Sequence, residues 1–486
     1  MLPFKSILKF DKNSAEAVYK QIASQLVLLI QKGILMPGMQ LPSTRVLAAD
    51  LGLHRKTIMA AYNALIAEDW IVSHERKEYR VSTLLPIIKP RSYAGQARTN
   101  YTAEAPFLFN EPQVRTLAVL SGKHKLIVDD GFPETDIFPV ERIAEEYKKL
   151  LTHHTLKKAS STWSIGGSKF FKDELAAFLN DTRGLNIEPE NLIVTRGAQM
   201  AIYLAASLLI KPGDKVLVTS PNYFLADAIF TQLGAQLIKV PVDGEGADVD
   251  AIESALINNS IKLLYIIPHH HHPTTVTMSS VRRVKLLRLI KDHQLSVIED
   301  DYDYDFQYQH SPYLPLASGD HNGNVIYIGS LTKVLGANFR LGYMISGVDF
   351  LNGALKLKSL IDLRCDVLME STIASLMQSG EFSRFIKKAN KLYNHRCGFT
   401  ANLLSNELPH LLEFVKPQGG MALWLKFKQE HSLAGILNKA SSLGLKFGGS
   451  TYLKKHNLGY EALRFGFASI DENNIEFAVD VLKRTL

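Results

Sequence analysis

The sequence predicts an α/β protein in which a small helical head precedes a much larger domain built on a mostly parallel β-sheet. The chain has 486 residues, more than a single hydrophobic core usually fills, so at least two domains are expected. The first 82 residues combine helical periodicity with two short extended runs. From about residue 124, short apolar strands alternate with helical runs, which favours a parallel sheet covered by helices on both faces.

Composition is typical of a globular protein and excludes other classes. Hydrophobic residues make up 46% and charged residues 21%, and no apolar stretch is long enough to span a membrane. The N-terminal residues lack the pattern of a signal peptide. Two cysteines, Cys365 and Cys397, are too few for a disulfide framework, so we expect a cytoplasmic protein. Of the net charge of +7, residues 1–90 supply an excess of five, with twelve Lys and Arg against seven Asp and Glu.

The predicted head, residues 1–82, consists of three helices and a hairpin. Apolar residues at helical spacing and two extended runs place the helices at Ala17–Ile34, Thr44–Leu51 and from about Arg55, and the strands at Trp70–Ser73 and Tyr79–Ser82. Ser43 is a suitable N-cap for the second helix, and Gly52 supplies the turn to the third. The order is helix, helix, turn, helix and then a hairpin, as in a winged helix-turn-helix.

This order of elements suits DNA binding. A helix fits the major groove, and its first residues reach the base edges. The third helix begins with His54, Arg55, Lys56 and Thr57. Arg45 lies at the start of the second helix, where its guanidinium and the helix N-terminus could bind a phosphate. The alternative from the pattern alone is a three-helix protein-interaction module with an exposed basic turn.

The residue order favours DNA binding. The run G-x-L-x-P-G-x-x-L-P-S-T-R-x-L-A-x-x-L-G-L-H-R-K-T, Gly33–Thr57, resembles the GntR family of winged helix-turn-helix regulators and is most similar to its MocR/GabR subfamily. The resemblance implies that Arg45, Arg55 and Thr57 face operator DNA. Family members often have a glycine at the tip of the wing. This chain has Arg76-Lys77-Glu78 there, so no DNA contact is assigned to the wing.

Residues 83–123 are predicted to be a linker. They show no sustained periodicity, and polar residues separate four prolines, Pro86, Pro90, Pro106 and Pro112. A structureless stretch of this length is unusual inside a domain but expected between two domains.

The large domain is predicted to span residues 124–486, with a smaller α+β part from about residue 350. Its predicted strands are Leu192–Thr195, Lys215–Thr219, Leu237–Val240, Leu263–Ile267, Ser296–Glu299, Val325–Gly329 and Leu341–Ser346. Helical runs such as Gln199–Leu209, Phe224–Leu233 and Ser280–His293 separate them. Ligands of such sheets bind beyond the carboxyl ends of the strands, so residues at those ends are candidates for chemistry.

Two of these strand ends carry reactive or charged groups. Lys333 follows Val325–Gly329 and can form an imine with an aldehyde. Ser330 and Arg340 flank it and can bind a phosphate. Asp300 follows another strand, where a buried carboxylate can keep a pyridine nitrogen protonated. Each residue alone has a structural alternative, because most lysines are surface residues and a carboxylate at a strand end often caps a helix.

Two further strand ends complete the pattern. Ala198 and Gln199 begin a helix, whose backbone N–H groups can bind a phosphate. Tyr223 offers an aromatic face after the strand Lys215–Thr219. Either feature is weak alone, whereas the order and spacing of all four strand ends are specific.

Together these features resemble fold-type I aminotransferases, in particular the effector domain of MocR/GabR regulators. The resemblance rests on the phrases Gly131-Phe132-Pro133, Thr195–Gln199, Ile298–Asp303 and Ile326–Tyr343. It implies pyridoxal 5'-phosphate as cofactor and gives each candidate residue a role. The resemblance implies that Lys333 is the Schiff-base lysine, that Asp300 binds the pyridine nitrogen and that Tyr302 binds the phenolic oxygen. It also implies that Tyr223 stacks on the ring and that Arg464 binds an effector or substrate carboxylate. The implied phosphate-binding residues are Ala198, Gln199, Ser330 and Arg340.

The chain departs from the family at four consecutive histidines. The usual T-P-S-H-Q-F-P-T-G is replaced by Ile267-Pro268-His269-His270-His271-His272-Pro273-Thr274-Thr275. Consecutive residues of an extended segment point to opposite faces, and no carboxylate stands at ligand spacing, so we expect polar lining near the cofactor and no metal site. Leu225 replaces an arginine of the GABA-responsive regulator, so GABA is not assigned as effector.

Three functions fit these features. The chain is expected to be a regulator whose cofactor-binding domain senses an amine, an amino acid or pyridoxal phosphate, and which binds DNA as a homodimer because winged-helix heads recognise paired half-sites. The alternative is a working aminotransferase with an accessory DNA-binding head, and the residues present are compatible with residual transaminase activity. A DNA-binding scaffold without cofactor is disfavoured by the presence of Lys333, Asp300 and Arg340.

Overall fold

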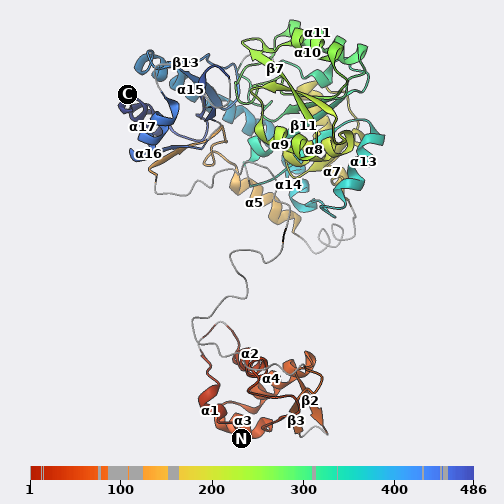
Figure 1. Cartoon of the computed structure of the whole chain (residues 1–486), viewed down its shortest axis with the longest axis vertical. Helices are drawn as coiled ribbons and strands as arrows, with labels where there is room; N and C mark the ends of the chain where they lie inside the picture. The colour runs from red at the N-terminus through yellow and green to blue at the C-terminus, as the bar shows by residue number, and fades with distance from the viewer. Residues whose placement is uncertain are drawn as a thin grey trace. The chain divides into compact units, whose positions relative to one another are not determined.

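The computed structural model describes residues 2–12, 14, 16–74, 78–85, 108, 124–151, 164–308, 313–336, 338–428, 432–448, 451–452 and 458–485. The chain divides into two compact units, residues 1–110 and 111–486, which are drawn in Figure 1. Most of the predicted linker and the tip of the predicted wing, with Arg76 and Lys77, lie outside the described residues.

The first unit contains the three predicted helices and the predicted hairpin. Its elements are α1 Phe4–Ile7, α2 Val18–Gln31, β1 Gln40–Leu41, α3 Thr44–Leu51, α4 Arg55–Ala67, β2 Ile71–His74 and β3 Glu78–Val81. The short strand β1, which the sequence did not predict, pairs with β3, so the sheet has the order β1-β3-β2. Ser43 caps α3 by accepting from the Val46 amide, and Gly52 ends that helix at φ +62°, which sets the turn into α4.

The helices of the head share one apolar core. Ile22 and Leu26 of α2 and Ile58 of α4 are fully buried in it. Tyr62 of α4 is also buried, and its hydroxyl donates to the Pro42 carbonyl oxygen at 2.9 Å. That bond joins α4 to the segment that precedes α3, so the two helices of the predicted helix-turn-helix are held in one arrangement.

The second unit is built on an eight-stranded sheet with the order β5-β12-β11-β10-β9-β6-β7-β8. The strands are β5 Leu192–Thr195, β6 Lys215–Ser220, β7 Gln236–Asp243, β8 Gly246–Ala247, β9 Ile261–Ile266, β10 Val297–Asp301, β11 Val325–Ser330 and β12 Gly342–Ile345. All neighbouring pairs are parallel except those that involve β12 or β8. The predicted α/β fold with a mostly parallel sheet is confirmed.

Two findings refine the predicted strands. β12 is antiparallel because the connection from β11 holds only the four-residue helix α12, Thr332–Leu335, and a parallel return needs a longer crossover. Strand β10 extends through Asp300 and Asp301, which the sequence placed after a strand. Both carboxylates are buried and accept hydrogen bonds from tyrosine hydroxyls, Asp300 from Tyr265 and Asp301 from Tyr327, so the strand tolerates them.

Helices cover both faces of this sheet, as Figure 1 shows. The main ones are α7 Lys169–Arg183, α8 Ala198–Leu209, α9 Phe224–Gln232, α10 Val249–Asn258, α11 Ser280–Asp292, α13 Val348–Lys358 and α14 Val367–Gln378. Alternate residues of β9 point to opposite faces: Leu263 and Tyr265 join the core beneath α8, α9 and α13, whereas Leu264 and Ile266 join the core beneath α10 and α11.

A smaller four-stranded sheet with the order β13-β14-β17-β16 lies in the C-terminal part. It consists of β13 Leu412–Glu413, β14 Ala422–Phe427, β16 Thr451–Tyr452 and β17 Glu461–Gly466, with α15 Glu381–Glu407, α16 Leu433–Ser442 and α17 Glu472–Arg484. β4, Leu126–Val128, pairs with β15, Leu445–Phe447, so the start of the unit belongs to this part.

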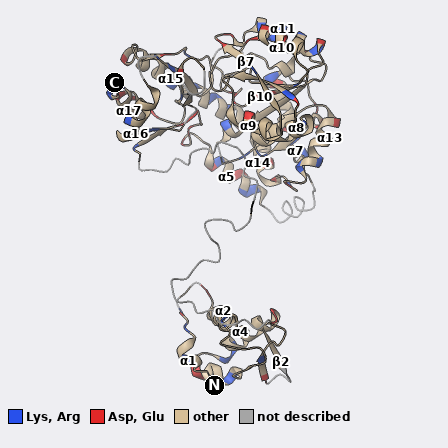
Figure 2. Cartoon of the chain, viewed as in Figure 1, with Lys and Arg blue, Asp and Glu red and all other residues tan. Residues whose placement is uncertain are grey.

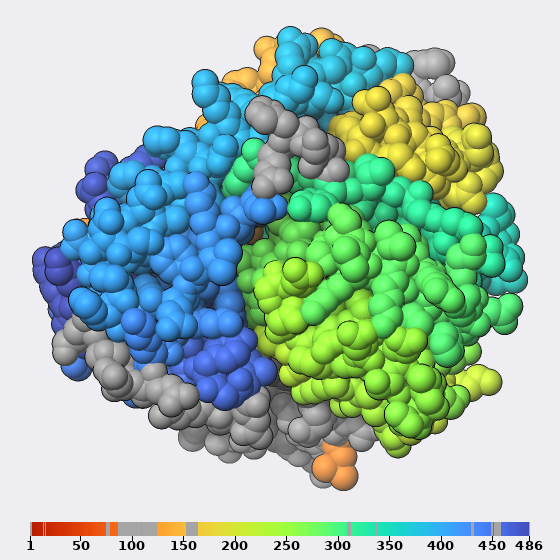
Figure 3. All heavy atoms as spheres, turned by 90° about the horizontal axis from the view of Figure 1, so that it is seen from above, coloured from red at the N-terminus to blue at the C-terminus, as the bar shows by residue number. Residues whose placement is uncertain are grey.

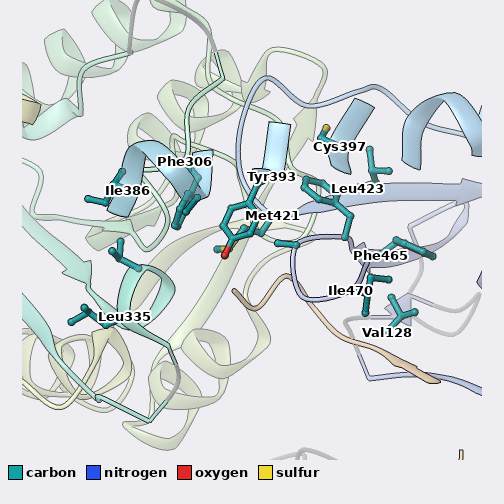
Figure 4. Packing of buried hydrophobic residues seen from close by; sticks show 14 of the residues in the cluster. Val128, Phe306, Leu335, Ile386, Tyr393, Cys397, Met421, Leu423, Phe465 and Ile470 are labelled. Atoms are coloured by element: carbon teal, nitrogen blue, oxygen red, sulfur yellow. The ribbon is translucent and has the colours of Figure 1, made fainter. Parts of the chain in front are cut away.

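One large core connects the two parts of the second unit. Figure 4 shows Phe306, which follows β10, beside Tyr393 of α15 and Met421 of the C-terminal part. The rings of Phe306 and Tyr393 lie 5.2 Å apart. Among the described residues, no helix combines the length and the apolar character that crossing a membrane requires.

Candidate functional site

Lys333 lies on α12, directly beyond the carboxyl end of β11. Its Nζ donates to the Gly131 carbonyl oxygen at 2.7 Å and is 4.0 Å from the centroid of the Phe132 ring. Asp129 accepts from the backbone amides of Gly131 and Phe132 and so holds this turn. Burial lowers the pKa of Lys333, which increases the fraction of neutral amine, the form that attacks an aldehyde.

Asp300 presents one satisfied and one unsatisfied carboxylate oxygen. Its Oδ2 accepts from the Tyr265 hydroxyl at 2.7 Å. Its Oδ1 is buried and has no hydrogen-bond partner among the described residues. Burial raises the pKa of Asp300 to about 7. A protonated pyridine nitrogen would supply both the missing donor and a compensating charge, so this residue fits pyridoxal phosphate.

Tyr302 and Arg464 form one hydrogen-bonded group. The Tyr302 hydroxyl donates to the His270 carbonyl oxygen at 2.8 Å and accepts from Arg464 Nη2 at 3.0 Å. Arg464, on β17, is 1% exposed, and it also donates to the carbonyl oxygens of Asp130 and Pro273. An incoming carboxylate would therefore replace protein acceptors that Arg464 already has.

The predicted phosphate-binding residues are brought to one edge of the sheet by strand register. β12 pairs with both β5 and β11, which sets Gly342 beside Thr195 on one side and Ser330 on the other. Ala198 and Gln199 form the first turn of α8, where backbone N–H groups lack intrahelical acceptors. This arrangement places an anion-binding helix start next to the end of β11.

Arg340 completes this edge. Its Nη2 donates to the Arg196 carbonyl oxygen at 3.0 Å. Gly197 has φ +87°, a backbone conformation that favours glycine, and a Cβ there would lie 3.1 Å from the Arg340 guanidinium and displace it slightly. The guanidinium is exposed and lies beside the start of α8.

Tyr223 lies at the start of α9, after the carboxyl end of β6. Its ring meets the His272 ring edge-on, with centroids 5.1 Å apart. Burial raises the pKa of Tyr223, and Asp300 contributes in the same direction through its charge, so the two side chains belong to one electrostatic environment.

The four histidines are all buried, and they have different partners. His269 accepts from Arg283 at 2.9 Å and lies 3.4 Å from Asp301. The other partners are Asp303 for His270 at 2.9 Å, Thr219 and Thr274 for His271 at 2.9 and 2.8 Å, and Asp130 for His272 at 2.9 Å. The sequence shows no carboxylate at ligand spacing, yet three carboxylates contact these histidines, because they come from distant parts of the chain. Within the described ranges, no group of three or more such side chains could hold a metal ion.

Several residues of the site were not found from the sequence. Asp130 and Phe132 lie beside and within the motif Gly131-Phe132-Pro133, which predicted no role for either residue. Tyr265 is one of several apolar-looking residues on β9, and nothing in its local pattern indicates its bond to Asp300. The contact of His272 with Asp130 joins residues 142 positions apart, beyond the reach of any local pattern.

The head presents its basic residues at the starts of two helices. Arg45 is exposed in the first turn of α3, and Arg55 is exposed at the first position of α4. Arg55 Nε donates to Thr44 Oγ1 at 3.4 Å, which ties the two helix starts together. His54 caps α4 by accepting from the Lys56 amide, and Thr57 is half-buried in the same turn. Figure 2 marks the basic residues of the head in blue.

A cleft of about 470 Å³ lies between the two parts of the second unit. Its lining includes residues 242–245 and 274–277 on one side and residues 413–418 on the other. Figure 3 shows the green surface of the first part beside the blue surface of the C-terminal part. Thr274 and Thr275 line this cleft and directly follow the histidine segment in sequence.

Comparisons with known proteins agree with this arrangement. Residues 124–482 match the family described as aminotransferase class I and II, and residues 18–81 match the gntR family of bacterial regulatory proteins. The probable rhizopine catabolism regulatory protein MocR of Rhizobium meliloti is 24% identical, across 98% of this chain and 95% of that protein. The 2-aminoadipate transaminase of Thermus thermophilus is 27% identical, across 73% of this chain and 88% of that protein.

Among solved structures, an archaeal alanine:glyoxylate aminotransferase is 28% identical, with a TM-score of 0.68, over 74% of this chain and 90% of that one. The similarity to enzymes thus covers the second unit, whereas the similarity to the regulator covers both units. The chain belongs to the class I and II aminotransferase family and carries a GntR-type head, the arrangement of the MocR/GabR subfamily of transcription regulators.

Proposed function

We propose that this chain is a cytoplasmic transcription regulator that binds operator DNA through residues 1–82 and senses a small amine or amino acid through a pyridoxal phosphate site in residues 124–486. The observation that carries the proposal is the buried Asp300 Oδ1, which lacks a donor within the described part of the chain, in a unit that also holds Lys333. A carboxylate so placed fits a protonated pyridine ring. An aminotransferase alone has no need of a DNA-binding head.

Each residue of the site has a separate task in this proposal. Bound pyridoxal phosphate supplies an aldehyde that reacts with amines and a ring that withdraws electrons. Lys333 would bind the aldehyde carbon, and Asp300 would hold the proton on the ring nitrogen. Tyr302 would turn its hydroxyl from the His270 carbonyl oxygen to the phenolic oxygen, and Tyr223 would cover the ring face. The start of α8 with Ser330 and Arg340 binds the phosphate.

The regulatory step follows from competition for Lys333. An amine that took the place of Lys333 would leave the Lys333 amino group free for the Gly131 carbonyl oxygen and the Phe132 ring, which Nζ contacts in this structure. A carboxylate on the same amine would draw Arg464 away from Tyr302 or Pro273. Because Arg464 lies on β17 of the C-terminal part, the change would favour a different arrangement of that part, and so of two heads in a homodimer.

A working aminotransferase is the second candidate. It is favoured by the likeness of the second unit to solved aminotransferases and by the presence of the complete set of cofactor residues. Multiple turnovers with a common amino acid and an oxo acid, at a rate typical of metabolic enzymes, would support this candidate over the regulator.

The experiment that tests the proposal uses the full-length protein loaded with pyridoxal phosphate. We expect a visible absorbance band that Lys333→Ala abolishes, and binding to a labelled duplex from the region next to the chain's own gene. The Lys333→Ala protein should still bind this DNA but no longer respond to amines. A band that survives the substitution would contradict the assignment of Lys333.

A further inference from the structure

His272 lies at the candidate cofactor site but has no task in the proposed function. Its ring centroid is 5.1 Å from that of Tyr223 and 6.3 Å from that of Tyr302, edge-on in both cases. The side chain is almost fully buried. Its Nε2 is 2.9 Å from Asp130 Oδ2, whereas its Nδ1 is buried without a hydrogen-bond partner among the residues that the structure describes.

Asp130 determines which nitrogen of His272 carries the proton. A carboxylate only accepts hydrogen bonds, so Nε2 is the donor of this pair. Burial lowers the pKa of His272 and so disfavours the charged ring. The contact with Asp130 opposes this shift, and the nearby cations Arg464 and Lys333 act in the same direction as burial. In a neutral imidazole with a proton on Nε2, Nδ1 is an acceptor.

The same carboxylate also connects His272 to the arginine of the site. Asp130 Oδ1 lies 3.4 Å from Arg464 Nε, and the Asp130 carbonyl oxygen accepts from the same nitrogen at 3.1 Å. Lys333 donates to the next residue, Gly131. The short segment Asp130–Gly131 therefore contacts the Lys333 amine, the Arg464 guanidinium and the His272 ring.

We propose that His272 Nδ1 accepts a hydrogen bond from the effector. The effector class is then an amino compound that carries a second donor, such as a hydroxyl, an amide or a further ammonium group, besides the amine that competes for Lys333. This inference rests on the proposed function and narrows its ligand. A ligand that supplies the donor satisfies this buried acceptor and gains a hydrogen bond, whereas a ligand without the donor leaves the acceptor unpaired.

The four-histidine segment itself offers the matched variants. The family phrase has phenylalanine at the position of His272 and glutamine at that of His271. His272→Phe removes both ring nitrogens with a residue that relatives accommodate. His272→Gln keeps an N–H donor for Asp130 but has no acceptor at the position of Nδ1. His271→Gln is the control, because that buried histidine contacts Thr219 and Thr274 instead.

The experiment uses full-length protein loaded with pyridoxal phosphate and three pairs of amino acids of similar size: L-alanine and L-serine, L-valine and L-threonine, L-norleucine and L-lysine. Apparent Kd values are read from the change in the visible absorbance band, with no oxo acid present. We expect the donor-bearing member of at least one pair to bind wild type roughly tenfold tighter. The ratio should fall towards one in His272→Phe and His272→Gln and stay unchanged in His271→Gln.

Three results would overturn the inference. Ratios near one for every pair in wild type, or ratios that neither His272 variant alters, contradict it and leave the proposed function intact. A band that shifts in both His272 variants before any amine is added would show that Nδ1 serves the cofactor instead. Absence of the band from wild type would overturn the proposed function itself, and this inference with it.

Discussion

The two oxygens of the Asp300 carboxylate differ in the partners that the fold gives them. One accepts from Tyr265, and the other has no hydrogen-bond partner in the described part of the chain, where a protonated ring nitrogen could donate to it. The chemistry of a ligand that fits this site therefore depends on single polar atoms such as Asp300 Oδ1. The same is true of His272, where one nitrogen is committed to Asp130 and the other is not.

The substitution Asp300→Asn tests whether the buried Asp300 carboxylate destabilises the cofactor-free protein. In the cofactor-free protein, burial raises the pKa of Asp300 to about 7, from about 4 in the unfolded chain. The folded state then binds the proton more tightly, so stability falls as pH rises from about 4 through 7. We expect Asp300→Asn to be more stable than wild type at pH 8, by on the order of a few kcal/mol, and to lose this advantage near pH 4.

Thermal unfolding at several pH values measures this difference. Addition of pyridoxal phosphate should stabilise wild type at pH 8 and remove the advantage of the variant, because the ring nitrogen then pairs with the charge. If the stability difference between wild type and Asp300→Asn did not change with pH, the interpretation of Asp300 as a buried carboxylate without a compensating charge would be wrong.

Arg55→Ala tests the DNA-binding surface. Arg55 is exposed at the first position of α4, where a side chain reaches a base edge or a phosphate. We expect binding to the duplex described above to weaken about 10- to 100-fold, in fluorescence anisotropy at fixed salt concentration. Lys32→Ala, at the C-terminal end of α2, removes an exposed charge from the same head and should change the affinity for DNA much less. Equal effects would point to a general charge effect.

At the scale of elements, sequence patterns located the helices and strands but not their long-range partners. The strand Leu192–Thr195 and the helix Thr44–Leu51 were predicted with their observed bounds, because each is a short run bounded by clear turn or cap residues. The antiparallel direction of β12 was not predicted, since it follows from the length of a connection. The positions of the candidate residues at strand ends followed from the sequence pattern and their roles from the resemblance, whereas the contacts of Asp130 and Tyr265 came only from the structure.

The segment from His269 to Thr275 departs from the family phrase, and two of its residues, His270 and Thr275, have positive φ. Thr275 has φ +62°, where the family phrase has glycine, and a β-branched residue is disfavoured in this conformation. We expect Thr275→Gly to be about 1 kcal/mol more stable than Thr275→Ala, because both remove the side chain but only glycine relieves the backbone. Chemical unfolding measures both, and an alanine variant as stable as the glycine variant would show that the backbone carries no strain.

At the scale of the molecule, two units with separate cores must act together for regulation to occur. The head has its own apolar core, and the second unit has a sheet covered on both faces. We propose that homodimerisation brings two heads to paired half-sites on DNA.

Light scattering tests this proposal on the full-length protein. We expect a mass of about twice 54.2 kDa, with and without DNA-binding substitutions such as Arg55→Ala. The expected dimer should also bind a duplex with two half-sites in preference to one with a single half-site. A monomer at micromolar concentration would contradict the arrangement.

The shared carboxylate of Asp130 has a consequence for how such a regulator diversifies over evolutionary time. Its oxygens lie close to both His272 and Arg464. A descendant that exchanged His272 for an apolar residue would remove one hydrogen-bond donor from Asp130 and so alter its pairing with Arg464. Preference for the side chain of a signal molecule and affinity for its carboxylate would then change in a single mutational step, so that a duplicated gene could acquire a new signal without first losing its fold.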